Sequence, residues 1–225
     1  MNTTSTIAEQ VASHHRASAG QLPPEVAEAF ATEQRDLAAA GNPSGVAEPG
    51  SRLLDGKLLD VGRQPTTLAQ SLGGKPAVIL FYRGAWCPYC NIALRTYQAQ
   101  LVPALAERGI GLVAISPQAP DGSMTTKESK ELTFTVLSDP GNQIAGQLGI
   151  LTAPSDGTRV AQLQLGLDLT QVNADGTIGL PMPTVVIADA EGVIRWIDVR
   201  ADYTTRTEFG QVLQAVTDVI REIAA

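Results

Sequence analysis

Both cysteines of the 225-residue chain lie in one tetrapeptide, Cys87-Pro88-Tyr89-Cys90. The apolar run at 76–82 (PAVILFY) precedes it, and a pattern typical of a helix follows it. Two cysteines at this spacing can form a disulfide with little backbone movement. The free amide groups and positive dipole end in the first turn of a helix favour a thiolate, which is the reactive form of cysteine. The sequence therefore predicts a redox-active dithiol at a strand-to-helix junction.

Two other interpretations of the cysteine pair are open. A zinc site needs four ligands, or three plus water, and His14 and His15 would complete four donors. We interpret these histidines as solvated residues without a role, because they lie far from the cysteines in sequence. Two inert buried thiols are the second alternative, which the flanking Trp86, Pro88 and Tyr89 disfavour. We expect neither a metal nor another cofactor.

The composition is typical of a soluble globular protein, with 44% hydrophobic and 17% charged residues. The net charge of −7 argues against nucleic acid and anionic membranes as partners. No apolar run approaches the length of a membrane span, and the polar N-terminus lacks the order of a secretory signal. We therefore expect a cytoplasmic protein, and in a reducing cytosol a lasting structural disulfide is disfavoured.

The pattern of apolar residues divides the chain at about residue 50. Residues 1–50 predict a helical extension with helices at 7–17 and from Pro23 to Gly41, whose apolar face must pack on its own domain or on a second subunit. Residues 51–225 predict one α/β domain, with an insertion at 151–180 that is weakly amphipathic around 160–169. The expected elements are a hairpin at 53–61, strands at 77–82, 110–115, 134–137, 184–188 and 193–199, and helices at 67–72, 94–109, 121–132, 142–148 and 209–223.

The order of these elements predicts a mixed central sheet between helices. The dithiol then lies at the C-terminal end of a central strand, where ligands of open α/β sheets collect. Ser116, at the end of the next strand, either approaches this site or only ends its strand.

Three segments resemble the peroxiredoxin-like proteins of the alkyl hydroperoxide reductase and thiol-specific antioxidant superfamily: FYRGAWCPYCN at 81–91, LPMPTVVI at 180–187 and GVIRWI at 192–197. The resemblance extends from about residue 20 to the end of the chain. It implies a thioredoxin-like fold in which Pro183 is a cis-proline facing the dithiol.

The same resemblance places Cys90 at the peroxidatic position. Typical peroxiredoxins carry a threonine or serine three residues earlier and a proline seven residues earlier, where this chain has Cys87 and Arg83. They also carry an arginine near the late strand, where this chain has Pro183 and Thr184. Arg83 either replaces part of these donors or is a solvated residue at the end of a strand. We therefore expect a peroxidase of low efficiency.

The leading hypothesis is an enzyme that cycles Cys87 and Cys90 between dithiol and disulfide. Trp86 and Tyr89 would form the walls of its active site. As a peroxidase it reduces hydrogen peroxide or organic hydroperoxides and is regenerated by a thioredoxin- or glutaredoxin-type reductant. Cys-Pro-Tyr-Cys is also the glutaredoxin active-site sequence, so a disulfide reductase with Cys87 as the exposed nucleophile is the alternative. A non-enzymatic redox sensor is a third reading, since fold alone does not prove activity. The apolar N-terminal helices make a homodimer plausible.

Overall fold

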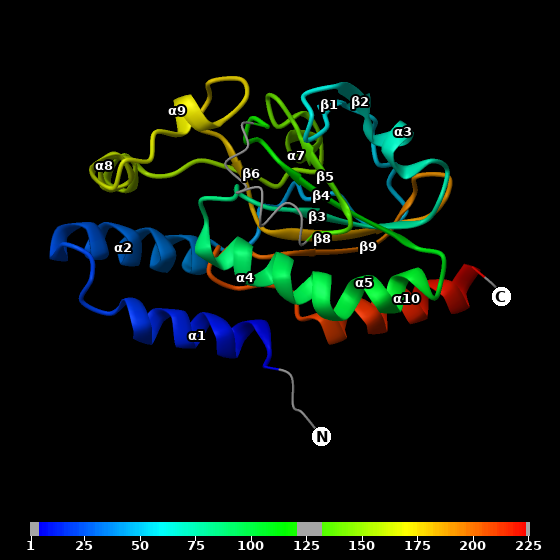
Figure 1. Ribbon diagram of the computed structural model, residues 1–225, viewed down its shortest axis with the longest axis horizontal. Helices are drawn as coiled ribbons and strands as arrows, with labels where there is room; N and C mark the ends of the chain where they lie inside the picture. The colour runs from blue at the N-terminus through cyan, green and yellow to red at the C-terminus, as the bar shows by residue number, and fades with distance from the viewer. Residues whose placement is uncertain (1–4, 121–131, 224–225) are drawn as a thin grey trace.

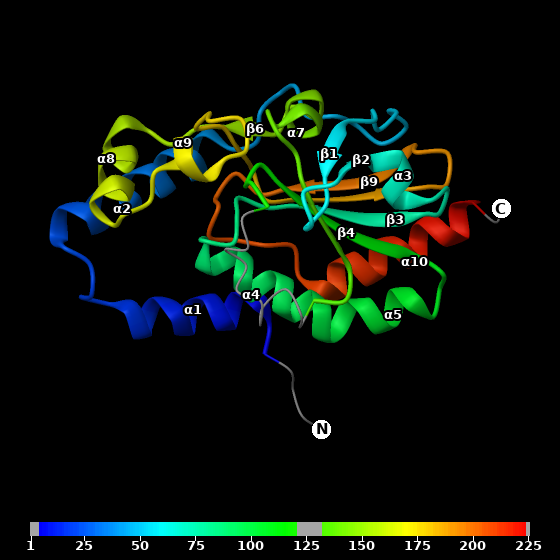
Figure 2. The same ribbon diagram turned by 45° about the horizontal axis from the view of Figure 1, so that its top comes forward.

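The computed structural model describes residues 5–120 and 132–223, which form a central seven-stranded mixed sheet between two layers of helices and loops (Figures 1 and 2). The expected helix at 121–132 falls almost wholly outside these described residues. The strand order is β2-β1-β5-β4-β3-β8-β9, and β6 and β7 form a separate two-stranded sheet. The strands are β1 (Lys57–Leu59), β2 (Pro65–Thr67), β3 (Ala77–Phe81), β4 (Gly111–Ser116), β5 (Thr135–Ser138), β6 (Leu151–Thr152), β7 (Leu180–Pro181), β8 (Thr184–Ala188) and β9 (Ile194–Val199).

The central strands β3, β4 and β5 are parallel, whereas β8 runs antiparallel to β3 and β9 antiparallel to β8. All five residues of β3 are buried, as expected for a strand covered on both faces. Val78 and Leu80 pack into one hydrophobic cluster, and Ile79 and Phe81 pack into the other. The predicted mixed sheet is thus confirmed.

Helices cover both faces of the sheet (Figure 2). One face carries a long helix, which consists of α4 (Pro88–Thr96), the π-helical segment η1 (Tyr97–Leu101) and α5 (Val102–Ala106), and beside it α10 (Phe209–Ile223). The other face packs on α3 (Leu68–Leu72) and α7 (Gln143–Gln147). No helix in the described part of the chain is long and apolar enough to cross a membrane.

Three sequence-based boundaries differ from the structure, and the first is the helix expected at 94–109, which begins at Pro88. The hairpin expected at 53–61 is formed by β1 and β2, because the Asp60 side chain accepts hydrogen bonds from the amides of Gly62 and Gln64 and places the turn there. The weakly amphipathic stretch at 160–169 lies partly in α8 (Asp156–Gln164), which begins earlier because Ser155 caps its N-terminus, and α9 (Leu169–Val172) follows.

The N-terminal helices pack on their own domain. In α1 (Ile7–Ser18), Ile7 and Val11 belong to the same hydrophobic cluster as α4 and α10. The α2 helix (Pro24–Ala40) packs against α8. Glu208, just before α10, accepts hydrogen bonds from the amides of Ile7 and Ala8 at 2.9 Å each and so caps the start of α1.

This docking predicts that α1 contributes to the stability of the whole domain. Ile7→Ala removes a fully buried side chain and is expected to lower the free energy of unfolding by about 2–4 kcal/mol. Val160→Ala, at an exposed position of α8, is the control and is expected to change it by less than about 0.5 kcal/mol. Denaturant titration of both variants measures the difference, and equal midpoints would contradict the docking of α1.

Candidate active site

The dithiol lies where β3 leads into α4. Cys87 is the N-cap residue of α4 with an extended backbone, and Pro88 occupies the first helical position, where its missing N–H costs no hydrogen bond. Cys90 follows in the first turn, near the positive end of the helix dipole. Both thiols are free, and their residues are only 1% and 0% exposed. The exposed Cys87 of the disulfide-reductase alternative is therefore not found, because the side chains of the cluster that contains Val78 and Leu80 cover it.

Arg206 is the cation nearest to the two sulfurs in the described part of the chain. Its Nη2 atom donates to Cys90 Sγ at 3.0 Å and lies 3.9 Å from Cys87 Sγ. Its Nη1 atom donates to the carbonyl oxygens of Tyr203 and Thr205 at 2.6 Å each, which fixes the direction of the guanidinium. A charged donor at this distance stabilises a thiolate at Cys90.

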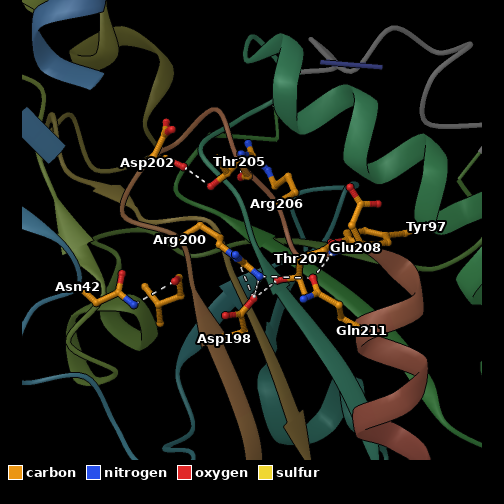
Figure 3. A network of polar contacts seen from close by, with 11 residues as sticks. Asn42, Tyr97, Asp198, Arg200, Asp202, Thr205, Arg206, Thr207, Glu208 and Gln211 are labelled. Carbon is orange, nitrogen blue, oxygen red and sulfur yellow. Dashed lines mark hydrogen bonds and ion pairs between the residues drawn. The ribbon is translucent and has the colours of Figure 1, made fainter. Parts of the chain in front are cut away.

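The segment that carries Arg206 is held by polar contacts on both sides (Figure 3). The Asp198 carboxylate accepts from the Thr207 hydroxyl at 2.6 Å and forms an ion pair with Arg200 at 2.7 Å. The Tyr97 hydroxyl, from the π-helical segment, donates to the Thr207 carbonyl. These contacts fix the backbone on the C-terminal side of Arg206, so the guanidinium has little freedom to leave the sulfur.

The two thiols are tuned in opposite directions. Burial alone would raise the pKa of Cys90, but a hydrogen bond from Cys87, the charge of Arg206 and the backbone N–H of Arg83 hold it well below its usual range. Burial, together with the hydrogen bond to Cys90, raises the pKa of Cys87 well above its usual range. The opposite shifts and the shorter distance from Arg206 to Cys90 favour a thiolate at Cys90 and a thiol at Cys87.

Cys90, but not Cys87, lines a cavity of about 20 Å³. The other walls come from β3, β8, the long helix and the segment of Arg206, and they include Leu80, Leu94, Tyr97, Thr184, Val185 and Arg206. The volume is enough for a molecule little larger than water.

Pro183 lies in the wall of this cavity, but the peptide bond before it is trans, since the described residues contain no cis peptide bond. The predicted cis-proline is therefore wrong. The Pro183 carbonyl accepts from the Arg200 amide at 2.9 Å, which extends the β8–β9 ladder by one residue. Pro183 is thus an ordinary residue at the start of a strand, where its missing N–H is tolerated.

Arg83 is not a solvated end-of-strand residue, because it is only 6% exposed. Its guanidinium carbon lies 3.9 Å from the centre of the Tyr203 ring and 5.1 Å from that of Trp86. Burial raises the pKa of Tyr203 to about 12, so its ring remains neutral. Arg83 therefore adds a second fixed positive charge behind the dithiol, and its backbone N–H contacts Cys90.

The histidines of α1 lie next to the dithiol helix and are not isolated from it. His15 Nε2 lies 2.9 Å from the Tyr89 hydroxyl, and the rings of His14 and His15 meet the Tyr89 ring edge to face. No group of three or more potential metal ligands is found among the described residues, so the structure gives the zinc alternative no support. The α1 helix instead lies against Tyr89, which stands between the two cysteines in the sequence.

A protein-family model described as the AhpC/TSA family matches residues 49–197. This chain belongs to the AhpC/TSA family. The family predicted from the three sequence segments is thereby confirmed.

A curated relative, a protein named putative peroxiredoxin bcp from Haemophilus influenzae, is 39% identical over 80 residues, 34% of this chain and 49% of the relative. The chain therefore matches about half the length of that relative. Peroxidoxin BcpB from Mycobacterium tuberculosis is a structural neighbour with a TM-score of 0.56 and 18% identity, covering 77% of this chain and 97% of that one. Reduced Prx3 from Vibrio vulnificus, in complex with H2O2, has a TM-score of 0.59 and 17% identity over 76% of this chain and 99% of that one. These likenesses confirm the thioredoxin-like peroxiredoxin fold.

The sequence predicted one feature of this AhpC/TSA site and missed another. The motif predicted the dithiol, whereas Arg206 was missed, because 116 residues separate it from Cys90 and no spacing signal connects them. Ser116 does not line the cavity beside Cys90. Its side chain forms a hydrogen bond with Tyr82, whose pKa burial raises to about 12.

Gly84 fixes the loop that joins β3 to the AhpC/TSA dithiol. Its φ of +151° is a conformation that residues with a side chain rarely adopt. A Cβ atom there would lie 2.4 Å from Trp86 Nε1 and 2.8 Å from Gln118 Oε1. Gln118 Oε1 also accepts from the Ala85 amide at 2.8 Å, so the loop has no room to shift.

Gly84→Ala is therefore expected to destabilise the reduced protein by about 1–3 kcal/mol and to change Trp86 fluorescence. Gly157→Ala in α8 is the matched control, because a Cβ there meets nothing within 4 Å and the helix gains from alanine. Thermal unfolding and fluorescence spectra of the two variants test this prediction. Equal stabilities would show that the loop is not constrained as described.

Proposed function

We propose that this protein is a thiol peroxidase in which Cys90 attacks the peroxide and Cys87 resolves the product. The observation that carries the proposal is the position of Cys90, which lines the small cavity with its Sγ 3.0 Å from Arg206 Nη2, whereas Cys87 does not line it. The lowered pKa of Cys90 and the raised pKa of Cys87 agree with this assignment. Membership of the AhpC/TSA family and the similarity to a putative peroxiredoxin and a peroxidoxin support the same interpretation.

The first step forms an S–O bond and breaks the O–O bond. The Cys90 thiolate attacks one peroxide oxygen, becomes a sulfenic acid and releases hydroxide from hydrogen peroxide, or alkoxide from an organic hydroperoxide. The proton of the Cys87 thiol neutralises the released hydroxide or alkoxide through solvent, which leaves Cys87 as a thiolate for the second step. Arg206 stabilises the negative charge while it moves from sulfur to oxygen.

The second step forms the disulfide. The Cys87 thiolate attacks the Cys90 sulfenic acid, an S–S bond replaces the S–O bond, and the released hydroxide takes a proton from solvent. Two thiol equivalents of an external reductant then restore the dithiol. We propose a thioredoxin- or glutaredoxin-type reductant and a reducing compartment, which this step requires. A homodimer stays a prediction from the sequence.

The alternative disulfide reductase needs an accessible, ionised N-terminal cysteine. The burial of Cys87 and its raised pKa argue against that activity in the reduced state. Reduction of insulin disulfides, measured as turbidity and dependent on Cys87, would support the alternative. A redox sensor would form the same disulfide without catalytic turnover in the presence of dithiothreitol and excess peroxide.

The roles of the two cysteines predict different products in single variants. With one equivalent of hydrogen peroxide, Cys87→Ser is expected to accumulate a sulfenic acid that dimedone traps, because the serine hydroxyl can still donate to Cys90 but cannot resolve it. Cys90→Ser is expected to yield no adduct, and the unsubstituted protein is expected to yield an intramolecular 87–90 disulfide. Mass spectrometry distinguishes the three. Trapping at Cys87 in Cys90→Ser would reverse the assignment.

The lowered pKa of Cys90 predicts a reaction that persists in mild acid. A group with a lowered pKa stays ionised as the pH falls below the usual thiol value of about 8.5, so the rate constant with peroxide is expected to stay level there. Arg206→Gln removes the charge, raises the pKa of Cys90 and is expected to reduce the rate at pH 6 by roughly ten- to a hundredfold.

Two further variants control for this effect. Arg206→Lys keeps the charge and is expected to retain more of the rate constant with peroxide at acidic pH than Arg206→Gln does. Arg195→Gln removes a charge that pairs with Asp189 on the surface of β9, and its pH profile is expected to match that of the unsubstituted protein. A profile of Arg206→Gln with an unmoved midpoint would exclude Arg206 as the cause of the lowered pKa.

A further inference from the structure

We propose that Tyr203 is a positioning residue for the reactive sulfur, because its ring holds the guanidinium group of Arg83 near Cys90. This inference rests on the proposed function, in which Cys90 is the sulfur that attacks. It is carried by three features of the described residues. These are the stacking of Arg83 on the ring, the lack of an ion pair that would fix Arg83 instead, and the turn that fixes the ring itself.

The ring of Tyr203 is the aromatic group nearest to the Arg83 charge. The guanidinium carbon of Arg83 lies 3.9 Å from the centre of the Tyr203 ring and 5.1 Å from that of Trp86. Arg83 and Tyr203 are each only 6% exposed. A cation that stacks on an aromatic face in such a buried place is attracted more strongly than at the surface, because little water competes for it. The Tyr203 ring therefore determines where the Arg83 charge lies.

No carboxylate takes over this role. In the described residues, 5–120 and 132–223, Arg83 belongs to no ion pair and its guanidinium donates no hydrogen bond. Glu33 lines the same pocket as Arg83 and Tyr203, but one of its oxygens accepts from the Ser155 amide at 2.7 Å. Arg206, by contrast, is fixed by two carbonyl oxygens. The direction of the Arg83 guanidinium thus depends on its ring contacts.

The Tyr203 ring projects from a turn that other contacts fix. The Asp202 carboxylate accepts from the Thr204 amide at 2.9 Å and from the Thr204 hydroxyl at 2.8 Å. The Tyr203 carbonyl accepts from Arg206 at 2.6 Å, and the Tyr203 hydroxyl accepts from the Gln34 side chain at 3.3 Å. A ring anchored at its backbone and at its hydroxyl gives a stacked cation a fixed place.

The place of the Arg83 charge matters because that charge acts on Cys90. Burial opposes the thiolate, whereas a hydrogen bond from Cys87, the charge of Arg206, and the backbone N–H and charge of Arg83 lower the pKa of Cys90. Without the Tyr203 ring, the Arg83 guanidinium is free to turn toward solvent, where water screens its charge. The Cys90 thiolate then loses part of its stabilisation.

The experiment titrates the Cys90 thiol directly in the full-length protein. The background is Cys87→Ser, which leaves Cys90 as the one thiol of the chain, and the ultraviolet absorbance of the thiolate is followed against pH. Tyr82, a further titratable group within electrostatic reach of Cys90, stays neutral in this range because burial raises its pKa to about 12. Tyr203→Leu is expected to raise the midpoint of Cys90 by about one pH unit.

The sign of this shift separates positioning from a general loss of packing. Looser packing lets water reach Cys90, which favours the charged form and lowers the midpoint. Loss of the Arg83 charge raises the midpoint. A midpoint that stays the same or falls in a folded Tyr203→Leu variant would contradict the proposal.

Two control variants are expected to leave the midpoint of Cys90 unchanged. Tyr203→Phe keeps the ring and loses only the hydrogen bond with Gln34. Phe134→Leu removes a ring from a partly buried position just before β5. A rise in Phe134→Leu equal to that in Tyr203→Leu would show that loss of any ring has this effect, and it would overturn the proposal.

A double-variant cycle tests whether Tyr203 acts through Arg83. Arg83→Gln removes the charge, so adding Tyr203→Leu to it is expected to cause no further shift. Two full and additive shifts would exclude Arg83 as the route.

A second substitution covers the case in which circular dichroism shows that Tyr203→Leu does not fold. Arg83→Lys keeps the charge but lacks the planar group that stacks on the ring, and it is expected to raise the midpoint of Cys90. An unchanged midpoint in folded Arg83→Lys would show that stacking is not needed.

Failure of this inference and failure of the proposed function are separate results. With Cys87 present, Tyr203→Leu is expected to react with hydrogen peroxide about tenfold more slowly than Tyr203→Phe in mild acid, as a shift of about one pH unit implies. If peroxide oxidises Cys90 but Tyr203→Leu leaves the midpoint unchanged, the function stands and the inference fails. If the midpoint rises but peroxide leaves Cys90 intact in every variant, the peroxidase function fails and the positioning of Arg83 by Tyr203 is supported.

Discussion

A guanidinium group placed against a buried sulfur is the contact on which this site depends. Burial alone would keep both thiols neutral and unreactive, and the first turn of α4 offers only partial charge to oppose it. Arg206, 3.0 Å from Cys90 Sγ, supplies a full charge at the point where the thiolate needs it. Arg83 adds a second charge from the opposite side. Together these charges favour the ionised form of Cys90 over its neutral thiol.

The surrounding fold holds that contact in place. The Tyr97 hydroxyl and the Asp198 carboxylate fix Thr207, the residue after Arg206, while Glu208 joins the same segment to the start of α1 (Figure 3). Tyr97 begins a π-helical segment in the long helix, a type of distortion that is common at functional sites. The N-terminal helix α1 therefore helps to hold the segment that carries Arg206 and also packs into the hydrophobic core.

Cys87 occupies the position at which typical peroxiredoxins carry a threonine or serine. In this chain Cys87 instead forms a hydrogen bond with Cys90, and in our proposal it is the resolving thiol. The charge that the expected arginine would supply comes in this chain from Arg206, which reaches Cys90 from the segment between β9 and α10. This arrangement places the two sulfurs within one helical turn of each other.

The sequence by itself determined the dithiol, its place between β3 and α4, the mixed sheet and the family, because these depend on local spacing and on periodic burial along single elements. It could not determine that Arg206 reaches Cys90, that Cys87 is sealed from solvent or that the bond before Pro183 is trans. Each of these depends on packing between segments that are distant in the chain, as the 116 residues between Cys90 and Arg206 illustrate. Tertiary structure alone brings such a charge to a buried sulfur, and the charge decides which thiol is ionised.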